Sequence, residues 1–387
     1  MIKRIYHIAL RECGILRRNP IYLFCMLIFP VCMIFFFTSL MNEGQPMELP
    51  VGVVDQDNTS VSRKMIRNLD SFQASHVIAH YPNMNEAREA IQKNEIYAFL
   101  LIPKGTTDEL LSSRQPKISF YYSSVTILAG SMLFKDLKTI STLGSAGVAA
   151  TKLSAVGKTS EEIRTILQPI TLDLHMINNP WSNYNVYLTT SMVPGLLMLF
   201  IFLITPYSIG TELKFKTAKE WIALSDNNIH VAIAGKMFPQ TLTFLTIFYG
   251  FEYYIFYILG FPHSGGPIPL LLIGLLAVLA CQGFGIFIFA LMPSLRMSMS
   301  VCSLWSVVSF SASGATFPVV AMDPMIQAIA QLFPLRHFYM IYQISIFNGF
   351  PLSDCWLHIA ALLAFFALPM LNINHIKTAM LKYIYIP

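Results

Sequence analysis

The sequence predicts a polytopic α-helical membrane protein with six transmembrane helices and an inserted extracytoplasmic α/β domain. Its 387 residues are 55% hydrophobic and only 12% charged, whereas soluble domains average about 25% charged residues. Residues 21–40 form an uncharged apolar stretch, long enough to cross a hydrocarbon core about 30 Å thick. A polar segment follows at 41–186, and the chain is then mostly apolar from 187 to 372.

Five further apolar stretches complete the predicted set of spans. They are residues 188–209, 237–259, 268–292, 297–317 and 355–372. Residues 318–350 are only partly apolar and carry several prolines, so we expect a re-entrant segment or an interfacial helical pair there. A cleaved signal peptide is the competing interpretation of residues 1–40, but its apolar region would span only about 7–15 residues.

Basic residues determine the predicted orientation. Five of them precede the first span: Lys3, Arg4, Arg11, Arg17 and Arg18. The lysines after residue 186 fall in loops or the tail on the same side, so both termini are expected in the cytoplasm. Residues 1–20 then form an amphipathic helix on the membrane, and 373–387 a cytoplasmic tail. The net charge of +5 follows from these loops and gives no argument for nucleic-acid binding.

Segment 41–186 has the pattern of a small α/β domain, in which strands alternate with short helices. The expected strands are 49–54, 76–80, 97–102 and 118–122, and the expected helices are 60–69, 85–93 and 108–113. Residues 127–175 are predicted to be helical and to form a stalk. The pair Asp55 and Asp57, and the pair His76 and His80, could serve acid–base or metal chemistry. For the two aspartates, ordinary turn capping is the alternative. The six cysteines lie in or near the spans without metal-ligand spacing.

The loop between the second and third spans, residues 210–236, carries a short amphipathic pattern. Glu212 and Glu220 belong to its polar side, whereas Trp221 and Leu224 supply apolar contacts. Two interpretations explain this pattern equally well. One is an interfacial helix with Trp221 as an anchor among the headgroups, and the other is a helix that docks a partner protein.

Several phrases resemble one known family. They are Val51–Ser60 with Ser62-Arg63, Glu86-Ala87 with Tyr97–Pro103, Glu212 with Thr217, Ala223-Leu224 and Gly235-Lys236, and Phe317-Pro318 with Phe333–Leu335. In their order, and with one span before a large domain and five after it, they resemble the ABC-2 permeases, the membrane subunits of ATP-binding-cassette exporters. The resemblance covers nearly the whole chain. One departure is Lys216, where the family usually has glycine before threonine, so an altered turn is expected.

The resemblance implies a dimer of two permease subunits, each seated on an ATP-binding-cassette ATPase. Residues 1–20 would be a connecting helix, and coupling to the ATPase would fall on Glu212, Thr217, Glu220, Trp221 and Leu224. The sequence itself contains no GxxxxGK[ST] phosphate-binding loop. We therefore expect a non-enzymatic chain that binds no cofactor, with ATP and magnesium on the partner subunit.

Polar residues inside the predicted spans are candidates for a substrate pathway. Glu252 is the only acidic residue within a confident span, and such a carboxylate either serves the pathway or is satisfied by neighbouring groups. The same two interpretations apply to Gln282, Ser303, Ser306, Ser309 and Ser313, since small hydroxyl residues also permit close helix packing. Pro318 and Pro334 interrupt helices beyond the fifth span and are candidates for an outer gate.

The leading functional hypothesis is an exporter permease in a bacterial inner membrane that moves an apolar or amphipathic substrate. A periplasmic adaptor is a further possible partner besides the ATPase, the second permease and the lipid membrane. The alternative is a non-transport sensor or scaffold whose external domain binds an envelope ligand or partner. An intramembrane enzyme would need clustered His, Asp or Glu within the spans, and Glu252 stands alone there.

Overall fold

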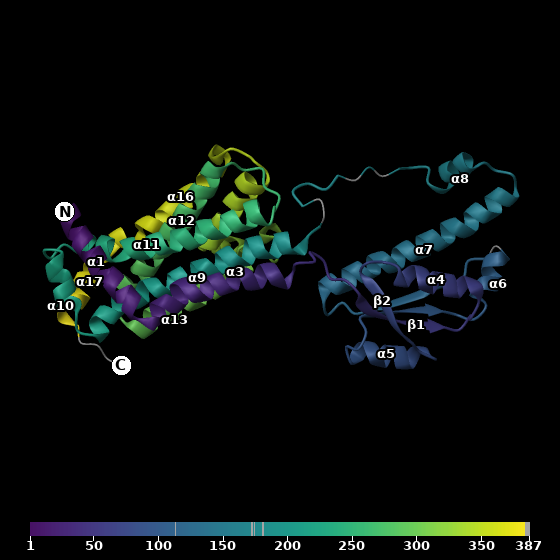
Figure 1. The fold of residues 1–387 in the computed structure, drawn as a ribbon, viewed down its shortest axis with the longest axis horizontal. Coiled ribbons are helices and arrows are strands. Elements are labelled where there is room, and N and C mark those ends of the chain that lie inside the picture. The colour runs from purple at the N-terminus through teal and green to yellow at the C-terminus, as the bar shows by residue number, and fades with distance from the viewer. Residues whose placement is uncertain (113, 172, 174, 180–181, 384–387) are drawn as a thin grey trace. The chain divides into compact units, whose positions relative to one another are not determined.

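The computed structural model describes the chain except residues 113, 172, 174, 180–181 and 384–387. The chain divides into two compact units. The helical unit comprises Met1–Asn42 and Met176–Pro387, and the α/β unit comprises Glu43–His175. Helices build the first unit, and a sheet covered by helices builds the second (Figure 1).

The α/β unit is built on a four-stranded sheet. Its strands are β1 (Leu49–Asp55), β2 (Ser75–His80), β3 (Ala98–Ile102) and β4 (Ser119–Tyr122). They lie in the order β2-β1-β3-β4, with β2, β1 and β3 parallel and β4 antiparallel to β3. These strands lie within two residues of the expected positions. The central strand β1 is β-branched and buried on both faces, as Val51, Val53 and Val54 are fully buried.

Helices cover both faces of this sheet (Figure 1). They are α4 (Ser60–Asp70), α5 (Met84–Gln92) and α7 (Ile127–Ala155). The unit also contains α6 (Thr106–Leu111) and α8 (Ser160–Leu167), and α8 contacts α7. Helices α4 and α7 pack on the face of Val51 and Val53, and α5 packs on the face of Val54. The expectation of helix up to residue 175 is wrong beyond α8, since the described residues 168–171, 173 and 175 are not helical. Pro169 accounts for this end, because proline disfavours helix at the preceding residue.

Two aspartates after β1 close the loops of this unit. Asp57 accepts hydrogen bonds from the backbone N of Gly105 at 2.8 Å and from Oγ1 of Thr107 at 2.5 Å. Asp55 accepts from the backbone N of Asp57 at 3.0 Å and from Oγ of Ser62 at 2.7 Å. This geometry is turn and helix capping, the second of the two alternatives that the sequence left open.

The helical unit begins with α1 and the first span and resumes with the long helix α9. Its first elements are α1 (Ile2–Arg18), α2 (Pro20–Leu23), the π-helical η1 (Phe24–Ile28) and α3 (Phe29–Leu40). The middle elements are α9 (Tyr184–Lys214), α10 (Ala218–Leu224), α11 (Ile229–Tyr253), η2 (Tyr254–Ile258), α12 (Pro267–Leu291) and α13 (Leu295–Ala312). The last are η3 (Val319–Ala321), α14 (Pro324–Ala330), α15 (Pro334–Ile341), η4 (Tyr342–Phe347), η5 (Leu352–Cys355), α16 (Trp356–Ala367), η6 (Leu368–Leu371) and α17 (Ile373–Lys382).

Five helical stretches in the described chain are long and apolar enough to cross a membrane. They are Pro20–Leu40, Tyr184–Lys214, Ile229–Ile258, Pro267–Leu291 and Leu352–Leu371. They correspond to five of the six predicted spans, so the chain is a polytopic membrane protein. The remaining one, predicted at 297–317, is the 18-residue helix α13, which is rich in serine and does not reach this standard. A sixth span therefore stays a prediction.

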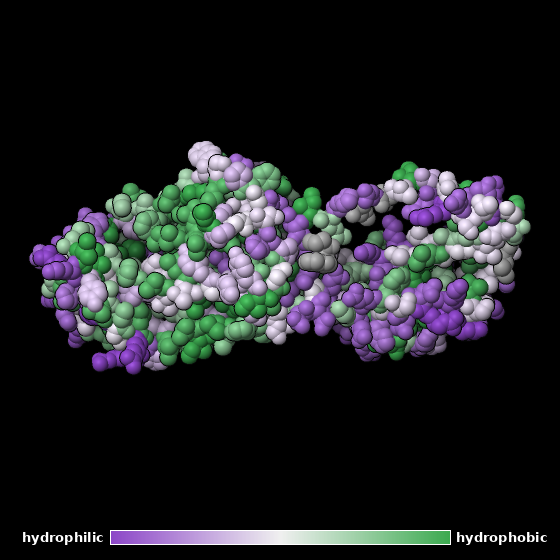
Figure 2. All heavy atoms as spheres, turned by 45° about the horizontal axis from the view of Figure 1, so that its top comes forward, coloured by the Kyte–Doolittle hydropathy of each residue, from purple (hydrophilic) through white to green (hydrophobic). Residues whose placement is uncertain are grey.

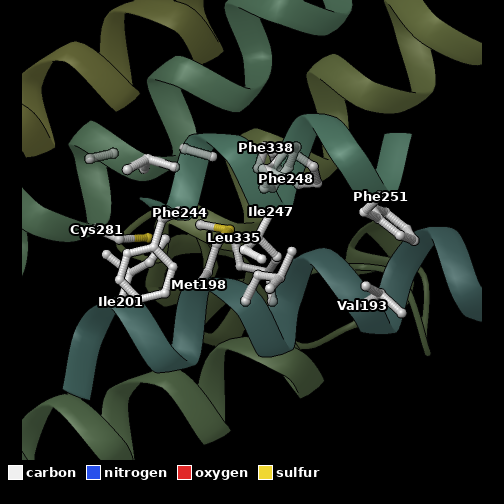
Figure 3. Packing of buried hydrophobic residues seen from close by; sticks show 14 of the residues in the cluster. Val193, Met198, Ile201, Phe244, Ile247, Phe248, Phe251, Cys281, Leu335 and Phe338 are labelled. Carbon is white, nitrogen blue, oxygen red and sulfur yellow. The ribbon is translucent and has the colours of Figure 1, made fainter. Parts of the chain in front are cut away.

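The helical unit has a large apolar core and an apolar outer surface. Side chains of α9, α11, α12 and α15 interleave in the core, among them Ile201, Phe248 and Phe338 (Figure 3). Large apolar side chains also face outward, for example Leu242 and Leu271. Figure 2 shows hydrophobic residues gathered over this unit and hydrophilic ones over the α/β unit. An extended exposed apolar surface is what contact with lipid requires.

The segment 318–350 contains the expected helical pair, α14 and α15. Pro324 and Pro334 each occupy the first helical turn. This position suits proline, because the missing N–H would have no partner within the helix anyway. The prolines therefore start helices here. Whether the pair enters the membrane stays a prediction.

Candidate functional site: a buried ion-pair cluster behind helix α10

Four charged side chains meet inside the helical unit, and we call them the ion-pair cluster. They are Arg11 and Glu12 from α1, Glu212 from the end of α9, and Lys236 from α11. The residues Glu12, Glu212 and Lys236 are at most 2% exposed, and the Arg11 side chain is 18% exposed. With two cations and two anions, the formal charge of the cluster is zero.

Every charge in the ion-pair cluster contacts both charges of opposite sign. Arg11 holds Glu212 with two parallel hydrogen bonds, Nη1 to Oε1 at 2.7 Å and Nη2 to Oε2 at 3.0 Å. Lys236 Nζ donates to Glu212 Oε1 at 2.7 Å and to Glu12 Oε1 at 2.5 Å. Arg11 Nη1 also lies 3.2 Å from Glu12 Oε1. The bidentate arginine pair is the geometrically specific member of this set.

Burial and pairing act in opposite directions on these charges. Burial raises the pKa of Glu12, and the neighbouring Lys236 charge only partly opposes it. Burial also works against the charge of Arg11, but the hydrogen bond and charge of Glu212 outweigh it and raise the pKa of Arg11. Among the described residues, Glu12 Oε2 has no hydrogen-bond partner. Glu12 therefore carries its charge against the effect of burial, whereas pairing with Glu212 keeps Arg11 charged.

Gly235 allows α1 to approach α11 closely enough for these contacts. A Cβ atom at Gly235 would lie 2.7 Å from Cβ of Ile8 and 3.1 Å from the carbonyl oxygen of Ile5. Both distances are too short for ordinary packing, so a side chain here would push α1 away. The adjacent residues Gly235 and Lys236 therefore have related roles. Gly235 lets α1 approach α11, and Lys236 binds the carboxylate of Glu12 on α1.

A tight turn joins α9 to α10 beside the ion-pair cluster. Lys216 adopts a left-handed backbone conformation with φ of 60°, which glycine adopts at less cost than other residues. Lys216 therefore takes a conformation that would suit a glycine at this position. An altered turn relative to the family stays a prediction. Thr217 follows, and its Oγ1 donates a hydrogen bond to Glu212 Oε2.

Helix α10 presents one face to the cluster and the other outward. Trp221 is fully buried, and Lys236 Nζ lies 5.1 Å from the centre of its ring. Apolar side chains of α1, α9, α11, α12 and α17 complete this second core. On the outer face, Glu220 is exposed and Leu224 is 40% exposed, and Phe215 in the turn is 61% exposed. These three side chains form what we call the outer face of α10.

The five residues predicted to couple to an ATPase divide into two groups. Glu220 and Leu224 lie on the outer face of α10, whereas Glu212 and Trp221 are buried within the subunit. Thr217 is half-buried between them. The interpretation of Trp221 as a headgroup anchor is wrong, because the indole packs inward over Lys236. Of these five residues, Glu220 and Leu224 are therefore the two that a partner protein can reach most directly.

The sequence did not predict that Arg11, Glu12 and Lys236 would be charged members of this site. It also did not predict the exposed Phe215 or the packing of α17 against α10. A signal was present in α1: the adjacent charges Arg11-Glu12 lie in a helix with apolar Ile8 and Ile15 nearby. Nothing in the sequence showed that Glu212 would meet Arg11 across 201 residues, or that Lys236 would meet Glu12 across 224 residues. A hollow of about 840 Å³ also opens beside the cluster, lined by Arg11 on one side and by Phe215, Thr217 and Glu220 on the other.

The predicted pathway residues lie apart from the ion-pair cluster. Glu252 on α11 is 4% exposed, and its Oε1 has no hydrogen-bond partner in the part of the chain that the structure describes. Gln282 on α12 accepts a hydrogen bond from Thr241 Oγ1 at 2.7 Å, but no described residue bonds to its Nε2. Buried polar atoms without partners are costly in proteins. Both side chains therefore have hydrogen-bonding capacity to spare.

The serines of α13 lie on a packed face. Ser306, Ser309 and Ser313 are each 1% exposed, and Ser303 is half-buried. Ser309 Oγ donates to the carbonyl oxygen of Ser306 at 2.6 Å, and Ser313 Oγ donates to that of Phe310 at 2.8 Å. Within this subunit the three buried serines fit close helix packing, the first of their two interpretations. Their part in a pathway remains untested.

The candidate outer-gate prolines lie at helix starts after α13. Pro318 precedes the short helix η3, and Pro334 is the first residue of α15. Arg336 of α15 donates from Nη1 to the carbonyl oxygen of Ser313 at 2.9 Å. This hydrogen bond joins α15 to the end of α13. A gate remains a prediction.

The fold and the ion-pair cluster define a polytopic membrane protein in which buried charges lie behind the short helix α10. Comparison with known proteins agrees: residues 20–371 match the family model described as ABC-2 family transporter protein. The chain belongs to this family, and membership implies an ATP-binding partner subunit. It is also similar to the linearmycin resistance permease protein LnrN of Bacillus subtilis (strain 168), with 22% identity over 385 residues, 95% of this chain and 97% of the relative.

Proposed function

We propose that this chain is the permease subunit of an ABC exporter that moves an amphipathic or apolar substrate outward across a bacterial inner membrane. ATP hydrolysis takes place in a separate subunit, which holds the ATP and magnesium, and this chain has no enzymatic activity of its own. One observation carries the proposal: the ion-pair cluster joins α1, α9 and α11 directly behind the outer face of α10.

The cluster supplies the stiffness that coupling needs. Separating opposite buried charges is expensive, since removing one partner of such a pair costs about 3–5 kcal/mol. A push on Leu224 or Glu220 by a closing ATPase is therefore passed to α9, α10 and α11 together. Because α9 and α11 continue into spans, movement of their ends changes the transmembrane packing. The hollow beside Phe215 offers a socket for a side chain of the ATPase.

Outward transport and the substrate class are supported by the relative and by the spans. The name of the relative LnrN states that it is a resistance permease, and removal of a toxic compound is one way to resist it. The basic residues before the first span support cytoplasmic termini, which places α10 on the side where ATP is found. Within the spans, the unpartnered Glu252 Oε1 and Gln282 Nε2 are available to a polar group on the substrate.

A second permease subunit is supported by the outward side of α13. Leu304, Val307 and Val308 are 68%, 55% and 43% exposed and lie at helical spacing on one side of α13. We propose that this side packs against the second permease, the same chain or a paralogue. Pro318 and Pro334 then lie near one end of the proposed interface helix, where an outer gate would form.

The test uses two matched leucines. Leu224 on α10 is 40% exposed, and Leu381 on α17 is 39% exposed. We expect Leu224→Asp to abolish co-purification of an ATP-binding-cassette ATPase in mild detergent and to reduce ATP-driven substrate uptake into inverted vesicles at least about tenfold, because a charge replaces an apolar contact. Leu381→Asp should leave both readouts unchanged.

Retention of the ATPase by Leu224→Asp would place the docking surface elsewhere. If no ATPase co-purifies with the unmodified protein under several gentle conditions, the exporter proposal fails. The sensor or scaffold function would then take its place. Size-exclusion profiles of both variants show whether either substitution has simply unfolded the protein.

A further inference from the structure

The α/β unit contains a cavity of about 1220 Å³ between α4, the second half of α7 and the segment that links α6 to β4. Helix α7 explains its origin. The first half packs on the sheet through buried Leu133, Leu137 and Ile140, but no residue from 141 to 155 is buried. The second half therefore runs on past the sheet and leaves a hollow against α4. Its volume exceeds the roughly 300–1,000 Å³ of typical small-molecule sites.

The charges around this cavity have one sign. Five lining side chains are cationic and none is anionic: Lys64, Arg67, Arg114, Lys117 and Lys152. Among the described residues, no ion pair involves the first four of these. A concave surface lined by charges of one sign concentrates the electrostatic potential. The cavity thus attracts anions.

The floor of the same cavity is apolar. Met65 and Ile140 are buried beneath it, and Leu143 of α7 contributes to its wall while 55% exposed. The cationic residues Arg114 and Lys117, in contrast, are exposed. The cavity therefore combines a cationic rim with an apolar floor.

We propose that this cavity binds an amphiphile with an anionic head and an apolar tail. The head lies against Arg114, Lys117 and Arg67, and the tail covers Met65, Ile140 and Leu143. A neutral apolar ligand would leave Lys64, Arg67, Arg114 and Lys117 unneutralised, and a small hydrophilic anion would leave the apolar floor in water. Only an amphiphile matches both. The inference rests on the α/β unit and does not depend on the exporter function.

The test uses the full-length protein in phosphatidylcholine nanodiscs and a fluorescent fatty acid, 11-(dansylamino)undecanoate. We expect saturable binding with enhanced dansyl emission. Laurate, which has both head and tail, should displace the probe at a concentration at least about tenfold lower than dodecanol, which lacks the charge, or sulfate, which lacks the tail. Equal displacement by dodecanol and laurate would overturn the proposal, as would the absence of saturable binding.

A pair of variants assigns the binding to this cavity. Replacing both rim cations in the loop before β4, Arg114→Gln with Lys117→Gln, should weaken probe binding about tenfold, since each partly exposed charge contact contributes up to about one factor of five. The matched control is Arg88→Gln with Lys104→Gln, two exposed cations of the same unit outside the cavity. An equal effect of both pairs would show non-specific attraction and overturn the assignment.

A further binding experiment distinguishes two possible occupants of the cavity, a membrane lipid and a compound taken up from solution. In nanodiscs that contain phosphatidylglycerol, reduced probe binding would identify an anionic lipid as the occupant. Unchanged probe binding would identify an amphiphile taken up from solution. Leu143→Asn weakens either occupant, because it removes apolar wall area without touching the charges, and an unaltered affinity in this variant would contradict a tail-binding floor.

Discussion

At the scale of single residues, the ion-pair cluster shows how buried charge can be retained. Each of the two carboxylates meets both cations, and Thr217 adds a hydrogen bond to Glu212. Buried ion pairs contribute little net stability compared with apolar packing, but an unpaired member is strongly destabilising. The cluster therefore acts less as a source of stability than as a constraint on where α1, α9 and α11 meet.

The first prediction concerns the balance of charge in this cluster. Glu212→Gln leaves Arg11 and Lys236 facing Glu12 alone, so we expect a loss of about 3–5 kcal/mol in stability. The control Glu220→Gln, in the exposed part of α10, should change stability by no more than about 0.5 kcal/mol. Thermal unfolding followed by tryptophan fluorescence measures both, since Trp221 lies against Lys236.

A double variant sharpens this test. Lys236→Met combined with Glu212→Gln restores a neutral cluster of Arg11 and Glu12. Part of the lost stability should therefore return, with a coupling energy of about 1–3 kcal/mol between the two substitutions. Strictly additive losses would mean that the two side chains do not interact as the structure has them.

At the scale of elements, the turn between α9 and α10 determines how the outer face of α10 is presented. Helix α9 ends at Lys214, and the chain reverses through Lys216 in a left-handed conformation. Such a conformation costs a residue other than glycine about 1–2 kcal/mol. The turn is retained at this cost because Thr217 N bonds to the Glu212 carbonyl oxygen at 2.9 Å and α10 packs through Trp221.

The second prediction follows from this backbone strain. Lys216→Gly should raise the stability of the helical unit by about 1 kcal/mol, because glycine adopts the left-handed conformation readily. Lys219→Gly removes the same charge from the same loop but lies inside α10, where glycine should cost about 1 kcal/mol. Melting temperatures of the two variants should therefore move in opposite directions; a decrease in both would contradict the strained turn.

At the scale of the whole molecule, the chain consists of two units with separate cores. Units of this kind can unfold independently, so one stability value does not describe the protein. A substitution confined to one unit should consequently leave the other unchanged. Asp57 is a suitable site, since its hydrogen bonds to Gly105 and Thr107 join two loops of the α/β unit.

The third prediction is that Asp57→Ala destabilises the α/β unit alone, by about 1–3 kcal/mol, through loss of a charged cap. Hydrogen exchange should speed up in residues 49–122 and stay unchanged around the ion-pair cluster.

The pH dependence of the stability that Asp57 contributes has a defined sign. Partial burial opposes the charge of Asp57, but hydrogen bonds from Thr107 and Thr59 outweigh it and lower its pKa.

This contribution of Asp57 is accordingly present above the ordinary aspartate pKa and is lost as the pH falls through the lowered folded-state pKa. Asp57→Ala should therefore remove part of the acid sensitivity of the α/β unit. Faster exchange in the helical unit of this variant would show that the two units are energetically coupled, against the prediction.

Local pattern was enough to place most elements of this fold. Apolar length placed five spans, and alternation with turn residues placed the four strands within two residues of where they lie. It failed after Leu167, where proline ended the helical pattern. The span predicted at 297–317 stays a prediction, because the serines of α13 make this helix only marginally apolar. These signals are local, because hydrogen bonding and burial within one segment produce them.

Composition and local pattern were sufficient for the membrane class, the α/β pattern, the family resemblance and the location of the candidate coupling loop. Helix packing had to be seen to show that Glu212 and Trp221 point inward, that Arg11, Glu12 and Lys236 surround them, and that a cationic cavity opens beside α7. The physical reason is distance along the chain. Charges that are 224 residues apart, such as those of Glu12 and Lys236, meet only when helices pack. No periodic pattern in the sequence predicts which of them will meet.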